Sequence, residues 1–148
     1  MSYSIDVNIL LYSTDASSPF HERALEFMES CAENSEPVFL AYLTLLSYVR
    51  IATHPRIFTD PLTPTEALAN IRKLSDLPQV RLVSEREGFL ELYQETTHKV
   101  TVRANLVPDA HLATLLRQHG VSTLYTNNAD DFAKFGFLDV RNPLASLA

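Results

Sequence analysis

The sequence is poor in cysteine, glycine and long apolar runs. Its single cysteine, Cys31, cannot form an internal disulfide, which excludes a small disulfide-stapled secreted domain. The three glycines match neither a phosphate-binding loop nor a dinucleotide fingerprint. No apolar stretch approaches the roughly 20 residues that a membrane-spanning helix needs, and no basic segment followed by an apolar run opens the chain. We therefore expect a cytoplasmic protein without a membrane partner.

Basic residues are also scarce. Lysine and arginine number 12 against 18 aspartate and glutamate residues, which gives a net charge of −6. A protein that binds duplex nucleic acid through its overall field is usually basic, so any contact with nucleic acid needs a local site. Hydrophobic residues make up 46% of the 148 positions, which excludes disorder and predicts a single domain spanning residues 1–148.

Short strand-like segments alternate with helix-like segments along the chain. We predict strands over residues 3–5, 37–40, 80–83, 122–125 and 138–141. We also predict a short helix or turn over residues 8–12, and helices over residues 20–31, 43–53, 65–75, 86–99, 109–119 and 129–134. Thr63 and Glu66 form a capping box before the fourth helix, Pro108 introduces the sixth, and Gly120 ends it. The helix over 43–53 is apolar on nearly every side, which predicts burial. This alternation is typical of an α/β fold with a mainly parallel central sheet covered by helices.

Acidic and amide side chains follow the predicted strands or open the helix that precedes one. They are Asp6 and Asn8 after the first strand, Asp109 at a helix start, and Thr126, Asn127, Asn128, Asp130 and Asp131 after the fourth strand. Each has an ordinary alternative role, since Asp6 could form a turn and Asp109 could cap its helix. Ligands bind at the carboxyl ends of parallel strands, so three such segments at one edge favour a functional site.

Clustered carboxylates stay ionised mainly when a cation lies between them. Oxygen ligands without cysteine favour a hard ion such as Mg²⁺ or Mn²⁺. Such an ion orients phosphate oxygens and lowers the pKa of a bound water, which suits phosphodiester hydrolysis. The pattern therefore predicts a metal-dependent nuclease.

Four blocks of the sequence resemble motifs of PIN-domain ribonucleases of the VapC type, the toxins of bacterial toxin–antitoxin pairs. In chain order these blocks are Ile5–Tyr12, Tyr48–Phe58, Leu106–Ala113 and Thr126–Phe132. The resemblance implies a three-layer α/β/α PIN-like domain that cuts RNA, typically in tRNA or rRNA loops, with Mg²⁺ or Mn²⁺. It also implies a cognate antitoxin as partner and a homodimer.

The resemblance assigns roles to individual residues. Asp6, Asp109 and Asp131 match the metal-binding, catalytic acids, and Thr126 and Asn128 match the polar residues beside the last of them. The sequence departs from the family at Ser47, where many PIN domains carry a glutamate. We expect Ser47 to share an inward-facing stripe with Leu43, Leu46 and Arg50. Because serine carries no charge, three carboxylates would remain where many relatives have four, and we expect one tightly bound ion. Asn8 is a further supporting polar residue.

Three arginines are candidates for binding substrate phosphates: Arg50, Arg56 and Arg103. Guanidinium groups match phosphate bidentately, although Arg50 could equally form a structural ion pair with one of the acids. Two alternatives to the nuclease stay open. The missing acid at Ser47 could indicate a catalytically impaired PIN-like binding module, and an Asp after a first parallel strand also occurs in phosphoryl-transfer domains of the receiver or haloacid-dehalogenase type.

Overall fold

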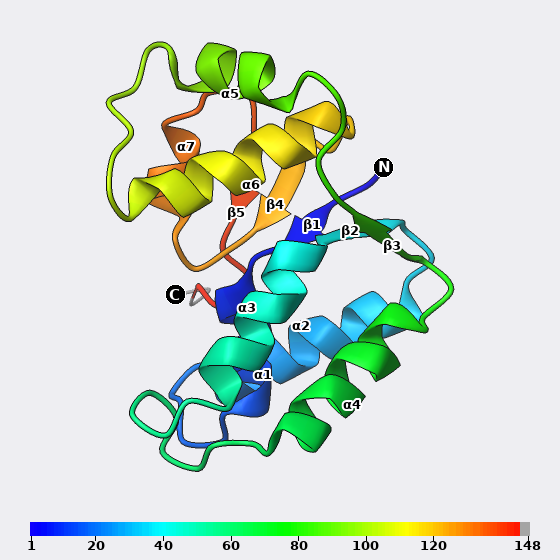
Figure 1. Cartoon of the computed structure of the whole chain (residues 1–148). Coiled ribbons are helices and arrows are strands. Elements are labelled where there is room, and N and C mark those ends of the chain that lie inside the picture. Colours follow the sequence, from blue (N-terminus) through cyan, green and yellow to red (C-terminus); the bar gives the residue numbers. More distant parts are fainter. Residues whose placement is uncertain (146–148) are drawn as a thin grey trace.

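A computed structural model describes residues 1–145 and shows parallel strands at the centre of the molecule (Figure 1). The strands are β1 (Ser4–Ile5), β2 (Val38–Ala41), β3 (Val80–Val83), β4 (Thr123–Tyr125) and β5 (Asp139–Arg141). β4 pairs with both β1 and β5, and β2 pairs with β3. A single parallel bridge between Tyr3 and Val38 joins the two groups. The order across the described strands is therefore β3-β2-β1-β4-β5.

Helices cover both faces of these strands. They are α1 (Val7–Thr14), α2 (His21–Glu33), α3 (Tyr42–Ala52), α4 (Pro64–Ser75), α5 (Phe89–Thr97), α6 (Leu106–Gln118) and α7 (Ala129–Ala133). Figure 1 shows α1 to α4 on one side and α5 to α7 on the other. Each side has its own apolar cluster, one around Ile9 and Leu45 and the other around Leu116 and Phe132. This confirms the predicted three-layer α/β/α arrangement.

The direction of chain progression reverses between β1 and β4. From β1 the order runs to β2 and β3 on one side, and from β4 to β5 on the other. In open α/β sheets the crevice for a ligand lies at such a switch point, outside the carboxyl ends of the strands. Asp6 directly follows β1 and Thr126 directly follows β4, so the topology places both residues at this crevice.

The predicted elements are all present, but two helices begin three residues away from their predicted starts. The capping box of Thr63 and Glu66 forms as predicted. α5 begins at Phe89 instead of Arg86, after Gly88 with a φ of 84°. α6 begins at Leu106, so that Pro108 lies inside its first turn rather than before it. A proline is tolerated there because the first N–H groups of a helix have no partner within the helix.

The prediction that the helix over residues 43–53 is buried is wrong for one of its faces. α3 buries Leu45, Tyr48 and Ala52, whereas Leu43 and Leu46 are 51% and 61% exposed. Because apolar residues occupy both faces of this helix, the periodicity could not distinguish the core-facing side. The proposed inward stripe that also includes Ser47 and Arg50 is therefore mostly outward-facing: Arg50 is exposed and Ser47 is partly buried.

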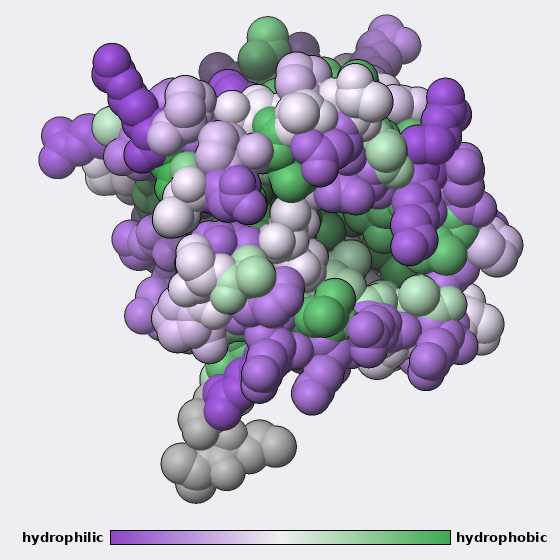
Figure 2. Space-filling model, turned by 90° about the horizontal axis from the view of Figure 1, so that it is seen from below, coloured by the Kyte–Doolittle hydropathy of each residue, from purple (hydrophilic) through white to green (hydrophobic). Residues whose placement is uncertain are grey.

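A cavity of about 410 Å³ lies among α1, α2, α3 and α4, away from the carboxyl ends of β1 and β4. Its lining includes Leu10, Met28 and Leu74, and its polar wall includes Tyr48, whose hydroxyl accepts a hydrogen bond from Asn70. Figure 2 views the molecule from the side of these helices and shows apolar surface in a hollow edged by polar side chains. None of the helices within residues 1–145 is both long and apolar enough to cross a membrane.

Candidate active site

Asp6 is held firmly at the carboxyl end of β1. Its backbone N–H donates to the Tyr125 carbonyl at 2.9 Å, and the residue is only 9% exposed. One carboxylate oxygen caps α1 by accepting from the Val7 N–H at 2.8 Å, and the other accepts from the Thr126 hydroxyl at 2.7 Å. Burial raises the pKa of Asp6, and the Thr126 and Val7 hydrogen bonds oppose this rise. The fold therefore holds the Asp6 carboxylate in one fixed orientation, although burying its charge is unfavourable.

Thr126 connects the ends of β1 and β4. Its side chain is fully buried, and its hydroxyl donates to Asp6 while accepting from the Asn128 N–H at 2.9 Å. The Asn8 side-chain amide lies 3.4 Å from both the Asp6 carboxylate and the Thr126 hydroxyl. The Asn8 oxygen accepts from the Asn127 N–H at 3.2 Å. These contacts bring together the predicted supporting residues Asn8, Thr126 and Asn128.

Asp109 joins this group from the first turn of α6. The Asn128 side-chain amide donates to its carboxylate at 3.1 Å. Burial, and to a lesser extent the negative charges of Asp6 and Asp131, raise the pKa of Asp109 to about 6, while Lys134 opposes this rise. Asp109 does not cap its own helix, because the N-cap position belongs to Asn105. Its carboxylate is thus kept in a field that disfavours its charge.

Asp131 lies in the first turn of α7 and is the most accessible of the three acids. Its side chain is 41% exposed and forms an ion pair with Lys134 at 3.1 Å. Lys134, together with the Asn128 amide, lowers the pKa of Asp131. This carboxylate is therefore already partnered by a cation of the chain itself. Lys134 was not among the predicted site residues, although its position three residues after Asp131 on a helix is a recognisable signal for an ion pair.

Several predicted residues are not joined to the acids. Arg50, Arg56 and Arg103 are exposed, and no ion pair within residues 1–145 involves their guanidinium groups. The alternative of a structural ion pair between Arg50 and an acid is therefore not realised in this part of the chain. Ser47 makes no recorded side-chain hydrogen bond to Asp6, Asp109 or Asp131.

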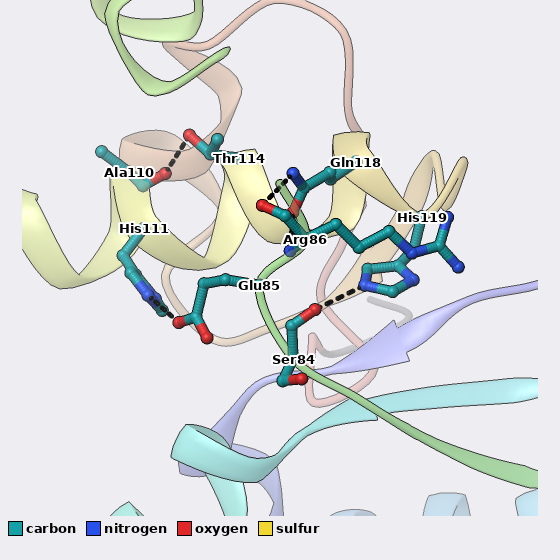
Figure 3. A network of polar contacts seen from close by, with 8 residues as sticks. All are labelled: Ser84, Glu85, Arg86, Ala110, His111, Thr114, Gln118 and His119. Atoms are coloured by element: carbon teal, nitrogen blue, oxygen red, sulfur yellow. Dashed lines mark hydrogen bonds and ion pairs between the residues drawn. The ribbon is translucent and has the colours of Figure 1, made fainter. Parts of the chain in front are cut away.

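The segment after β3 is fastened to the outer side of α6 (Figure 3). His111 contacts the Glu85 carboxylate at 2.6 Å, and His119 contacts the Ser84 carbonyl at 2.7 Å. Gln118 both accepts from the Arg86 N–H and donates to its carbonyl. These contacts hold α6, the helix that carries Asp109, at His111 near its start and at Gln118 and His119 near its end.

The donor set fits a hard divalent cation by its chemistry. Carboxylate oxygens from three segments are the ligands that Mg²⁺ and Mn²⁺ take up. Besides burial, the charges of Asp6 and Asp131 raise the pKa of Asp109, and a cation between the acids would relieve this repulsion. Within residues 1–145 no three acidic, histidine or cysteine side chains converge as a ready-made metal site. Asp131 instead contacts Lys134, so it has to leave that lysine to join a shared ion.

Comparison with known proteins identifies the family. None of the protein-family models compared with the chain matches it. Ribonuclease VapC48 of Mycobacterium tuberculosis is 38% identical over 145 residues, which cover 98% of this chain and 99% of that protein. The chain belongs to the VapC ribonuclease family. Ribonuclease VapC24 of the same species is 32% identical over 143 residues, covering 97% of each chain. The predicted resemblance to VapC-type PIN domains is therefore confirmed.

Solved structures of VapC proteins share the fold. The structure of VapBC-1 from nontypeable Haemophilus influenzae matches with a TM-score of 0.69 and 14% identity, covering 98% of this chain and 100% of that one. M. tuberculosis VapC20, described as a sarcin-ricin loop cleaving toxin, matches with a TM-score of 0.67 and 19% identity, covering 94% and 98%. At these identities the likeness establishes the VapC architecture.

Proposed function

We propose that this VapC protein is a Mg²⁺- or Mn²⁺-dependent endoribonuclease. The observation that carries the proposal is the electrostatic coupling of three carboxylates at the switch point between β1 and β4, where burial and then the charges of Asp6 and Asp131 raise the pKa of Asp109 to about 6. Such coupling is costly for a purely structural cluster and is typical of a functional site. The ribonuclease names of relatives that match nearly the whole chain support the same activity.

Asp6, Asp109 and Asp131 would hold the metal, which supplies a Lewis acid for the scissile phosphate and a more acidic bound water. Thr126 orients Asp6 with its hydroxyl, and Asn128 orients Asp109 with its side-chain amide. The pKa of about 6 leaves Asp109 mainly ionised at neutral pH, as a metal ligand must be. Ser47 adds no charge, so we propose one tightly bound ion.

The proposed substrate is a structured RNA, cut in a loop of tRNA or rRNA. The description of VapC20 as a sarcin-ricin loop cleaving toxin supports an RNA loop as target. With a net charge of −6, the protein would hold RNA through the metal and through the exposed Arg50, Arg56 and Arg103 rather than through a basic face. Its affinity for RNA should therefore depend on the divalent ion.

The proposed partner is a cognate antitoxin. Structures of related toxins solved together with their antitoxins, such as VapBC2 of Rickettsia felis with promoter DNA, support this partnership. The acidic crevice favours a basic segment of that partner. We further propose that residues 1–148 form one domain, that the toxin acts in the cytoplasm, and that it forms a homodimer as the family resemblance implies.

RNA cleavage by purified protein tests the proposed activity. Wild-type protein should cut RNA when Mg²⁺ or Mn²⁺ is added and stop when the ion is chelated. Asp6→Asn and Asp109→Asn should each lower the rate by more than about a hundredfold, because losing a metal ligand costs more than the 10- to 100-fold typical of an outer-shell change. Asp60→Asn, at an exposed loop position, is the matched control and should cut normally.

Two outcomes would replace this proposal. Tight binding to a partner without metal-stimulated cleavage of any RNA would favour a binding module that lost its activity with the acid at Ser47. Hydrolysis of a generic phosphomonoester that requires Asp6 would favour a phosphoryl-transfer domain. Full cleavage by both aspartate variants would show that the assigned acids are wrong.

A further inference from the structure

The side chain of Asn127 is clamped from two sides just beside the acids. Its amide nitrogen lies 3.3 Å from the Tyr12 hydroxyl, to which it donates. Its oxygen accepts from the Asn142 side-chain amide at 3.1 Å. Because both ends of the Asn127 amide are engaged within the protein, this side chain is occupied in holding the loop after β4 and not in reading a base.

Asn142 is itself anchored by the segment that follows β5. Its side-chain oxygen accepts from the Leu144 N–H at 2.9 Å, forming a turn, and Pro143 restricts the backbone between them. Leu144 is 2% exposed in the apolar cluster shared by α1 to α4. The Leu144 carbonyl accepts from Arg23 of α2 at 2.8 Å. The Asn142 amide is therefore presented to Asn127 from a buried anchor.

The backbone of Asn127 decides how the Asn8 amide is turned. The Asn127 N–H can only donate, so it selects the oxygen of Asn8 at 3.2 Å. The nitrogen of Asn8 then points toward the Asp6 carboxylate and the Thr126 hydroxyl, at 3.4 Å from each. An inverted Asn8 amide would place its oxygen against the Asp6 carboxylate. The loop position thus determines whether a donor or an acceptor faces the buried acid.

We propose that Asn142 is a positioning residue of the active site, which acts through Asn127 to keep the amide of Asn8 turned toward Asp6. The inference rests on the proposed metal-dependent cleavage and extends it to a residue that touches none of the three acids. Such outer-shell partners typically contribute 10- to 100-fold to metal affinity or activity. The segment after β5 then helps to position the side chains of the active site, in addition to ending the sheet.

Asn142→Asp is the sharpest variant. It retains the oxygen that accepts from Leu144 and removes the N–H group that donates to Asn127. Because this change also adds a negative charge, the neutral Asn142→Ser is measured beside it. Asn34→Asp is the matched control, since the Asn34 oxygen accepts from the Glu36 N–H at 2.9 Å in the same kind of turn at an exposed site.

Three measurements are made on each full-length protein at a temperature where it is folded: kcat and KM for RNA with Mn²⁺, the affinity for Mn²⁺ alone, and the side-chain amide signals of Asn8 and Asn127 by NMR. Both Asn142 variants should lower kcat by roughly tenfold with an unchanged KM. They should also weaken Mn²⁺ binding and speed the hydrogen exchange of the side-chain amides of Asn8 and Asn127. Asn34→Asp should match the wild type in all three.

A lower melting temperature with unchanged kcat and an unshifted Asn8 amide would overturn the proposal, because Asn142 would then only stabilise the fold. Normal kcat in Asn142→Ser would overturn it as well, since the loss in Asn142→Asp would come from the added charge. If the wild type cuts no RNA with either metal, the proposed function fails separately. The amide signals and the Mn²⁺ affinity of the variants then decide the positioning role.

Discussion

The two ends of the acid cluster differ in how firmly the protein holds them. Asp6 is 9% exposed, caps α1 and accepts from the fully buried Thr126 hydroxyl. Asp131 has a 41% exposed side chain and one recorded ion pair, to Lys134. Burial raises the pKa of Asp6, whereas Lys134 lowers that of Asp131. The fold therefore fixes the orientation of Asp6, whereas Asp131 is kept ionised by the flexible side chain of Lys134.

For the proposed metal site, this difference predicts two kinds of contribution to binding the ion. The buried end is preorganised, so its contacts cost little when an ion arrives. At the exposed end, Asp131 is ionised but paired with Lys134, and this ion pair would have to break before Asp131 could bind an ion. The negative charges of both acids raise the pKa of Asp109, in addition to its burial. Changes at the buried end should therefore affect activity more than changes at the exposed end.

The largest effect of a change that leaves all three acids in place is expected from Thr126→Val, which removes the hydroxyl at the buried end and conserves the shape of the side chain. The Asp6 carboxylate loses its 2.7 Å donor, so the pKa of Asp6 should rise further and Mn²⁺ affinity should fall by about 10- to 100-fold. Calorimetric titration with Mn²⁺ measures this change. Thr126→Ser keeps the hydroxyl and should retain most of the affinity; equal losses in the two variants would assign the effect to packing.

An intermediate effect is expected from Asp109→Asn on the stability of the metal-free protein. Asp109 has a pKa of about 6 in the fold against 3.8 for an ordinary carboxyl. The folded state thus binds more protons than the unfolded state between these values, and stability falls as pH rises through that window. After allowance for partial exposure, Asp109→Asn should be more stable by about 1–2 kcal/mol at neutral pH.

Urea unfolding with a chelator present checks this prediction at about pH 4 and about pH 7. The difference between Asp109→Asn and wild type should be largest at the higher pH and shrink at the lower one, where Asp109 is protonated. A difference independent of pH would mean that the charge of Asp109 is not the cause.

The smallest effect is expected from Lys134→Ala at the exposed end. Exposed ion pairs contribute about 0–1 kcal/mol, so freeing Asp131 from Lys134 should tighten Mn²⁺ binding by at most about fivefold. Lys73→Ala removes the same charge from an exposed position of α4 and corrects for the change in net charge. Weaker Mn²⁺ binding in Lys134→Ala than in this control would contradict the competition between lysine and metal.

The site residues that directly follow strands could be predicted from the sequence. The residues that position them through hydrogen bonds from elsewhere in the chain could be predicted less well. The placement of Asp6, Asn8 and Thr126 at one edge follows from strand ends alone, because parallel strands share a carboxyl edge. The outward face of α3 could not be predicted, since Leu43 and Leu46 look like core residues in the sequence. The link from Asn142 to Asn127 depends on β5 lying beside β4, and no spacing along the chain encodes it.

The bridge between Tyr3 and Val38 and the pairing of β1 with β4 have a consequence for the newly made chain. Asp6 is among the first residues to leave the ribosome, but its hydroxyl donor Thr126 and its neighbour Asp109 are among the last third. A nascent or prematurely terminated chain therefore carries Asp6, the first of the proposed metal-binding acids, without the partners that orient it. The order of synthesis therefore delays the assembly of the proposed site until almost the whole chain has been translated.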